Sequence, residues 1–209
     1  ARIGQSHQAA FIDNENFIEY AFIMNESNIN SDLLKEIALE QARFIQASSG
    51  GIKRTELKKI KQYFKLPHVV IIAGIRRAGK STLLSQIMHS LGNEIGYYFN
   101  FEDERLLNFS ATDFNRLYEV LLELYGERAF FFFDEIQNIS NWERFVRRMY
   151  DRGFHFFVTG SNASLLSREL GTRLTGRHVT STLYPFSFLE YLSFKGYSFQ
   201  TRDVLKTEK

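Results

Sequence analysis

The sequence predicts an α/β fold in which a parallel sheet is covered by helices on both faces. Short, wholly apolar runs such as Val69–Ala73 and Ala129–Phe133 have the length and composition of strands buried on both sides. Amphipathic stretches of helical periodicity, such as residues 112–125, separate these runs. Parallel strands need such crossover helices between them, so the alternation indicates a sheet with helices on both faces.

The first part of the expected domain is helical. Residues 32–47 carry apolar side chains near helical spacing, and Ser–Ser–Gly–Gly at 48–51 ends the run. The apolar positions are Leu33, Leu34, Ile37, Ala38 and Phe44. A second helix is expected over residues 53–64, with lysines on its solvent side. After Pro67 the composition changes from mixed polar and apolar residues to the apolar, largely β-branched run Val69–Ala73, which predicts the first strand.

Helices and strands then alternate. Glycines end two of the predicted helices, Gly92 after residues 80–91 and Gly126 after residues 112–125. Ser140 and Glu143 have the spacing of a capping box at the start of another helix, and we read its Trp142 as a packing residue. The remaining elements are strands over 95–101, 129–133, 154–158 and about 178–183, and a short helix over about 163–170.

Composition and charge limit the classes of function. Cysteine is absent, which excludes a disulfide framework, thiol catalysis and a cysteine-ligated metal site, and the five histidines are scattered. A formal net charge of +2 does not indicate a nucleic-acid or lipid partner. Apolar runs stay shorter than the roughly 18 to 20 residues that span a bilayer. We therefore expect no membrane contact and a cytoplasmic location.

We expect three parts in the chain. Residues 1–30 form an N-terminal extension that is either partly non-native or weakly ordered, since the chain begins without Met and Met24 is a candidate natural start. Residues 31–195 form the folded domain, and residues 196–209 form a C-terminal tail.

The strongest motif is the segment Gly74–Ser81, which matches G-x-x-x-x-G-K-S between a predicted strand and a predicted helix. Its glycines let the backbone curl so that successive N–H groups point at a triphosphate, and the next helix presents its positive end to the same anion. The motif predicts a nucleoside triphosphate and Mg²⁺ as cofactors, with Lys80 at the β- and γ-phosphates and Ser81 on the metal. The predicted nucleotide-binding residues are Gly74, Ile75, Arg76, Arg77, Ala78, Gly79, Lys80, Ser81 and Thr82.

A second motif ends the strand of phenylalanines at 130–133 with Asp134 and Glu135. The carboxyl ends of parallel strands lie at the edge where a phosphate-binding loop also sits. Asp134 is therefore a predicted Mg²⁺ ligand, acting through a bound water. Glu135 is the candidate to orient and deprotonate the attacking water. An additional strand between the loop and this motif, with Glu directly after Asp, is typical of the branch of P-loop proteins that includes AAA+ ATPases.

A polar cluster, Thr159–Asn162, follows the predicted strand at 154–158. In AAA+ ATPases a side chain at such a position senses the γ-phosphate, and the resemblance to them makes Asn162 or Ser161 the candidate here. Asn162 is equally a candidate N-cap for the helix expected after it.

These motifs together resemble the AAA+-type ATPases related to archaeal ATPases. The resemblance rests on GIRRAGKSTLL, YYFNFEDERL, FFFDEIQNISNWERFVRRMYD, TGSNASLLSREL, LTGRH and LYPFSFLEYL, and covers about residues 50–195. It implies a three-layer P-loop fold with five strands in the order 5-1-4-3-2. In this family the core usually precedes a C-terminal domain resembling a restriction endonuclease. We expect that domain and the helical lid of AAA+ proteins to be absent here, which would weaken nucleotide affinity and turnover.

The resemblance also suggests site residues beyond the two motifs. It places an acidic motif of the second strand at Asn100, Glu102 and Asp103. Its Leu-x-Gly-Arg motif ends at Arg177, a candidate catalytic arginine acting in cis or from a neighbouring subunit. Arg177 could equally hold Glu102 or Asp103 in a structural ion pair. Residues 53–55 precede the core where such families contact the nucleotide base.

Three functions remain open at this point. The first is an ATPase that binds Mg²⁺-ATP and hydrolyses it to ADP and phosphate. The second is a nucleotide-dependent switch with negligible turnover that regulates a partner protein or a C-terminal effector domain; a homo-oligomer is also compatible. The third is a DNA-associated ATPase, with DNA contacts from lysines at 58–61 or from Arg144, Arg147, Arg148 and Arg152, although the low net charge does not favour it.

Overall fold

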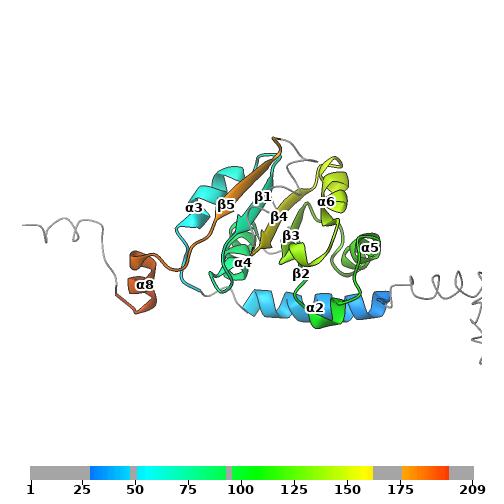
Figure 1. Ribbon diagram of the computed structural model, residues 1–209, viewed down its shortest axis with the longest axis horizontal. Coiled ribbons are helices and arrows are strands. Elements are labelled where there is room, and N and C mark those ends of the chain that lie inside the picture. The colour runs from blue at the N-terminus through cyan, green and yellow to red at the C-terminus, as the bar shows by residue number, and fades with distance from the viewer. Residues whose placement is uncertain (1–28, 48–50, 93–95, 162–175, 198–209) are drawn as a thin grey trace, which may run out of the picture.

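The five predicted strands form one parallel sheet in the computed structural model, which describes residues 29–47, 51–92, 96–161 and 176–197. The strands are β1 (Val69–Ala73), β2 (Gly96–Asn100), β3 (Phe130–Asp134), β4 (His155–Gly160) and β5 (His178–Thr182). Their order across the sheet is β2-β3-β4-β1-β5, which confirms the predicted order. Because β4 lies between β1 and β3 and all three are parallel, their carboxyl ends lie side by side at one edge of the sheet (Figure 1). The predicted helix over 163–170 and most of the predicted extension over 1–30 lie outside the described residues.

Helices cover both faces of the sheet, as the apolar strands require. The helices are α2 (Ser31–Ala47), α3 (Glu56–Ile60), α4 (Lys80–Leu91), α5 (Phe114–Tyr125), α6 (Trp142–Tyr150) and α8 (Phe188–Phe194). On one face α2, α5 and α6 pack against side chains such as Ile71. On the other face α3 and α4 pack against side chains such as Ile72, because alternate residues of β1 point to opposite faces. The α2 helix runs along the β2 edge, and its Ile45 joins the second cluster (Figure 1).

Phenylalanines pair across β3 and β4 on both faces of the sheet. The rings of Phe131 and Phe156 stack with centroids 4.9 Å apart, and those of Phe132 and Phe157 with centroids 5.3 Å apart. Each pair is in register across the parallel ladder, so the register of the hydrogen bonds sets the ring contacts. These contacts fix the end of β3 relative to β4, where the functional side chains lie.

The α8 helix has no counterpart in the predicted elements. Ser187 accepts a hydrogen bond from the Glu190 backbone N–H, and the Glu190 side chain accepts one from the Ser187 backbone N–H, which completes a capping box. Figure 1 shows α8 beyond the carboxyl end of β5, next to the region of α3 and α4. Several large apolar side chains of this helix are exposed: Phe188, Leu189, Tyr191 and Phe194.

Three local predictions were wrong. Ser140 and Glu143 do not cap α6: Asn141 is the N-cap residue, in a left-handed conformation and without a side-chain capping bond. The helix predicted over 53–64 is shorter, with α3 followed by a 3₁₀ turn at Lys61–Tyr63. Phe44 is 70% exposed instead of facing the core, because Ile45 takes the buried position at helical spacing from Leu34, Ile37 and Ala38. Within the described ranges, the helices are too short or too polar to cross a membrane.

Candidate nucleotide-binding site

The loop between β1 and α4 has the conformation that its glycines permit. Gly79 is the N-cap of α4 and has a positive φ of 91°, and Arg77 has a φ of 66°, which is rare for a residue with a side chain. A Cβ atom at Gly74 would collide with the carbonyl oxygen of Leu183. Unusual backbone conformations of this kind are costly and cluster at binding sites. A loop of this conformation at the start of a helix can present backbone N–H groups and the positive end of α4 to an anion.

Lys80 lies at the start of α4 with its side chain only 4% exposed. Its ammonium nitrogen is 3.1 Å from the carbonyl oxygen of Gly74 and 3.0 Å from Oε1 of Glu135. The ammonium group thus lies between the loop and the end of β3. A buried cation so placed can interact strongly with an anion held by the loop, since the local dielectric constant is low.

Asp134 is fully buried at the end of β3 and receives hydrogen bonds from three hydroxyl groups. Ser81 donates to its carboxylate, Tyr98 donates to Oδ2 at 3.2 Å, and Thr159 donates to Oδ1. Burial raises the pKa of Asp134, and the bonds from Ser81 and Thr159 oppose that rise. Burial and the neighbouring Asp134 also raise the pKa of the Tyr98 phenol, so it remains a proton donor to the carboxylate.

The oxygen donors at this point fit Mg²⁺. Ser81 offers a hydroxyl and Asp134 a carboxylate, which are hard ligands of the kind that Mg²⁺ prefers. The two side chains come from different elements, α4 and β3, and are hydrogen-bonded to each other. The predicted pair of Mg²⁺ residues is therefore brought together by the fold.

Glu135 follows Asp134 with a left-handed backbone, φ 50° and ψ 42°. Its backbone N–H donates to Oγ1 of Thr159 at 2.9 Å, and Nε2 of Gln137 donates to its Oε2 at 2.6 Å. This turn of the backbone places the Glu135 carboxylate next to Lys80, whereas the Asp134 carboxylate stays buried at the end of β3. The two acids thus have separate environments, as their separate predicted roles require.

Thr159 and Tyr98 were not predicted as site residues. Thr159 joins the two acids, because its hydroxyl donates to Asp134 and accepts from the Glu135 backbone. A signal existed in the sequence: Thr159 is a polar residue near the end of a buried strand, two positions before Ser161. Ser161 is exposed, and the predicted sensor Asn162 lies outside the described residues.

Arg177 was predicted near the nucleotide, and the structure places it elsewhere. Its backbone carbonyl accepts a hydrogen bond from Val69 N–H, at the amino-terminal end of β1, whereas the loop follows the carboxyl end of the same strand. The length of β1, about 3.3 Å per residue, separates the two. The in-cis role is therefore wrong, and so is the predicted ion pair with Glu102 or Asp103. Arg177 instead pairs with Asp151 at 3.3 Å.

Glu102, one of the two acidic residues predicted as a partner of Arg177, pairs with Arg76 instead. The Arg76 guanidinium lies 2.8 Å from Oε1 of Glu102, and both side chains are exposed. Asp103 pairs with Arg105, and this interaction lowers the pKa of Asp103. The acidic motif after β2 thus contacts the loop through one surface ion pair, which is a weak interaction in water.

A pocket of about 330 Å³ adjoins the loop. Its walls come from three separate parts of the chain: Gly51, Ile52 and Arg54; Arg77, Ala78, Gly79 and Thr82; and Pro185, Phe186 and Phe194. The walls are largely apolar and include two aromatic rings, those of Phe186 and Phe194. Of the residues predicted near the base, Arg54 lines this pocket.

The comparisons with known proteins agree with this architecture. A family model described as an AAA domain matches residues 66–192, more than half of the chain. An uncharacterized protein of Methanocaldococcus jannaschii is 35% identical over 188 residues, which are 90% of this chain and 41% of that protein. An uncharacterized protein of Haemophilus influenzae is 36% identical over 157 residues, 72% of this chain and 39% of that protein. The chain thus spans about two fifths of the length of these relatives.

Solved structures resemble the fold at low sequence identity. AMPPCP-bound DnaA from Aquifex aeolicus superposes with a TM-score of 0.44 and 14% identity, covering 73% of this chain and 55% of that one. RIF2 from Saccharomyces cerevisiae superposes with a TM-score of 0.47 and 13% identity, covering 83% of this chain and 72% of that one. The assignment rests on the family match, the parallel order β2-β3-β4-β1-β5 and the loop between β1 and α4. This chain belongs to the AAA domain family and has the P-loop nucleoside triphosphatase fold.

Proposed function

We propose that the site binds Mg²⁺-ATP and hydrolyses it to ADP and phosphate. The observation that carries the proposal is the convergence of Lys80, Asp134 and Glu135 at one edge of the sheet, directly beside the loop. A triphosphate would occupy the loop, with Lys80 exchanging its contact with Glu135 for one with the β- and γ-phosphates. Phosphoryl transfer depends mainly on positioning and on stabilising charge, and these residues supply both.

Each acidic residue has its own part in the proposed reaction. Ser81 and Asp134 would hold Mg²⁺, whose charge would offset the charge that develops on the phosphate oxygens. Glu135, released from Lys80, would orient a water molecule and accept its proton. Thr159 would keep Glu135 in position through the backbone N–H bond.

We place the nucleotide base in the pocket of about 330 Å³ beside the loop. The aromatic ring of Phe186 and the aliphatic side chain of Ile52 offer flat apolar surface to a purine. The lining residues favour a planar base without selecting adenine over guanine by a specific side-chain hydrogen bond. Adenine is therefore assigned from family membership, and titration with ATP and GTP tests it.

Two substitutions test the proposal. Glu135→Gln should retain ATP binding and lose phosphate release by about a hundredfold or more, since only the water-activating step is removed. Lys80→Ala should lose nucleotide binding itself. Isothermal titration with ATP and a phosphate-release assay separate the two effects. Unchanged turnover in Glu135→Gln would remove that residue from the reaction.

The second candidate function is a switch that binds ATP and turns it over negligibly. The contact between Lys80 and Glu135 favours considering it, because a carboxylate held by the lysine is not free to activate water. Phosphate release by the unaltered chain at saturating ATP distinguishes the two functions. Binding without release supports the switch.

A further inference from the structure

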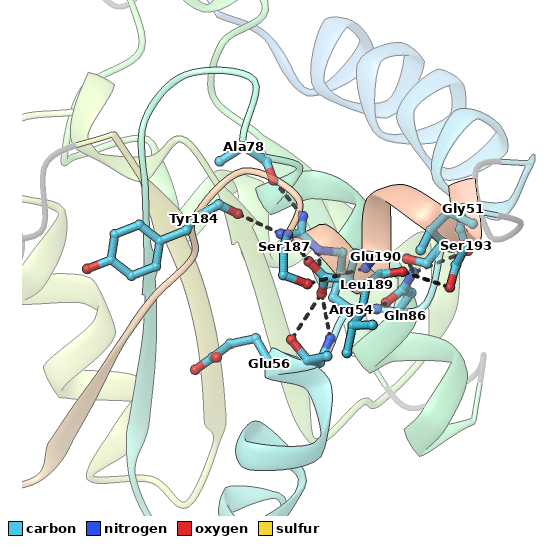
Figure 2. Close-up of polar contacts among 12 residues, drawn as sticks. Gly51, Arg54, Glu56, Ala78, Gln86, Tyr184, Ser187, Leu189, Glu190 and Ser193 are labelled. Carbon is cyan, nitrogen blue, oxygen red and sulfur yellow. Dashed lines mark hydrogen bonds and ion pairs between the residues drawn. The ribbon is translucent and has the colours of Figure 1, made fainter. Parts of the chain in front are cut away.

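A buried arginine joins the phosphate-binding loop to α8. The Arg54 side chain is 3% exposed and donates three hydrogen bonds to three different parts of the chain. Nη1 donates to the Ala78 carbonyl oxygen at 2.6 Å, Nη2 to the Tyr184 carbonyl oxygen at 2.6 Å, and Nε to Oε1 of Glu190 at 3.2 Å. Figure 2 shows the guanidinium group between the loop and the segment that leads into α8.

Glu190 holds that arginine in place from the first turn of α8. Its Oε1 accepts from Arg54 and also from the backbone N–H and the hydroxyl of Thr55, at 2.8 and 3.0 Å. Its Oε2 accepts from the backbone N–H of Ser187 at 2.8 Å. Burial alone would raise the pKa of Glu190, but the bonds from Thr55 and Ser187 and the charge of Arg54 lower it to about 2. The carboxylate is therefore charged and fully occupied at neutral pH.

The bond from Arg54 to Ala78 has a consequence for the anion site. In a trans peptide unit the C=O and the N–H point in opposite directions, and the described residues contain no cis peptide bond. The Ala78 carbonyl belongs to the same peptide unit as the Gly79 N–H. The hydrogen bond from Arg54 holds the Ala78 carbonyl oxygen on the outer side of the loop. The Gly79 N–H of the same peptide unit must then point to the inner side, where a phosphate would lie.

The arginine also limits what can replace Gly79. A Cβ atom at Gly79 would lie 2.9 Å from Nη1 of Arg54, so the guanidinium lies directly against the loop. The backbone of Arg54 is anchored separately, since its N–H donates to Oε1 of Gln86 on α4 at 3.1 Å. Arg54 is thus held in place by Glu190, which accepts a hydrogen bond from its side chain, and by Gln86, which accepts one from its backbone N–H.

We propose that Arg54 is a positioning residue that orients the Ala78–Gly79 peptide for phosphate binding, and that its contact with Glu190 couples nucleotide occupancy to the seating of α8. This inference rests on the proposed nucleotide site and adds a residue and a linkage to it. Coupling of this kind is reciprocal: nucleotide that favours the ordered loop stabilises seated α8, and displaced α8 weakens nucleotide binding.

The test uses the 209-residue chain and two matched substitutions. Arg54→Lys keeps the charge but cannot reach three acceptors in fixed directions, because lysine lacks the planar fork. Arg105→Lys makes the same chemical change at an arginine that pairs with Asp103 and with Glu36 and Glu40 of α2. Titration with ADP should give about tenfold or more weaker binding for Arg54→Lys and less than about twofold for Arg105→Lys.

Hydrogen exchange supplies a readout that a purely structural role would not move. In the unaltered chain, ADP should slow amide exchange in both residues 78–82 and residues 188–194. In Arg54→Lys, saturating ADP should still protect the loop but no longer α8. If Arg54→Lys does not fold, Glu190→Gln serves, with ADP affinity lowered about threefold or more and the same loss of α8 protection.

The outcomes separate this inference from the proposed function. If the unaltered chain binds no nucleotide, the proposed function fails and the inference with it. If it binds ADP and Arg54→Lys binds within about twofold of it, the inference is overturned and the nucleotide site stands. Equal losses in Arg54→Lys and Arg105→Lys would also overturn it, because the effect would then be general destabilisation.

Discussion

The ammonium nitrogen of Lys80 lies 3.0 Å from Oε1 of Glu135, so the phosphate-binding loop and the end of β3 are joined by an ion pair. Both side chains are largely buried, at 4% and 16% exposure. Removing one partner of such a pair leaves a charge without compensation, which costs more than the pair itself contributes.

We predict that Lys80→Ala destabilises the nucleotide-free protein by about 1–3 kcal/mol, because Glu135 then loses its cationic neighbour. Adding Glu135→Gln should recover part of this loss. Urea unfolding of both single variants and the double variant gives the coupling free energy of the two side chains. Additive effects within about 0.5 kcal/mol would show that the pair contributes nothing.

Thr159 should support catalysis without touching the nucleotide. Thr159→Val keeps the shape but removes the hydroxyl that contacts both Asp134 and the Glu135 backbone. We expect phosphate release to fall about 10- to 100-fold, the usual effect of losing a group that orients metal ligands. Thr159→Ser retains the hydroxyl and should restore most of the rate. A Thr159→Val variant with the unaltered rate would contradict the assignment.

Asp134→Asn should stabilise the nucleotide-free protein while removing Mg²⁺-dependent binding. Burial raises the pKa of Asp134, so the ionised form costs folding free energy at neutral pH. Asparagine removes that charge, and we expect a gain of about 1–2 kcal/mol at pH 7. The gain should shrink as the pH falls toward 3.8, where the carboxyl group also takes up a proton in the unfolded chain. Thermal unfolding at pH 7 and pH 4 measures both values, and a loss of stability at pH 7 would contradict the prediction.

Glu190 should contribute stability with the opposite pH dependence. Its pKa falls from 4.5 to about 2 on folding, so its contribution is complete above pH 4.5 and is lost as the pH falls toward 2. The shift corresponds to at most about 3 kcal/mol. Urea unfolding of the unaltered chain and Glu190→Gln at pH 6 and pH 3.5 should give a smaller difference at the lower pH. An equal difference at both pH values would mean that the charge of Glu190 is not what stabilises α8.

Much of the site could be predicted because its chemistry is local in the sequence. The loop motif, the strand before it and the helix after it occupy one continuous segment, and backbone N–H groups do the proposed binding. Asp134 and Glu135 were predictable because an apolar strand delivers whatever residues follow it to the carboxyl edge of a parallel sheet. The sequence also contained a sign that Arg177 lies far from the loop. Arg177 directly precedes a strand, so it lies at the amino-terminal edge of the sheet, opposite the carboxyl edge where the loop sits.

The amino-acid sequence alone determined the five-stranded parallel fold, the loop of residues 74–82 and the acidic pair at 134 and 135, because periodicity and backbone chemistry act over a few neighbouring residues. The tertiary structure decided the partners. It brought Thr159 and Tyr98 to Asp134, and Arg54 and Glu190 to the loop, across 136 positions of chain between the last two. Such contacts depend on strand register and helix docking, which no local pattern of residues specifies.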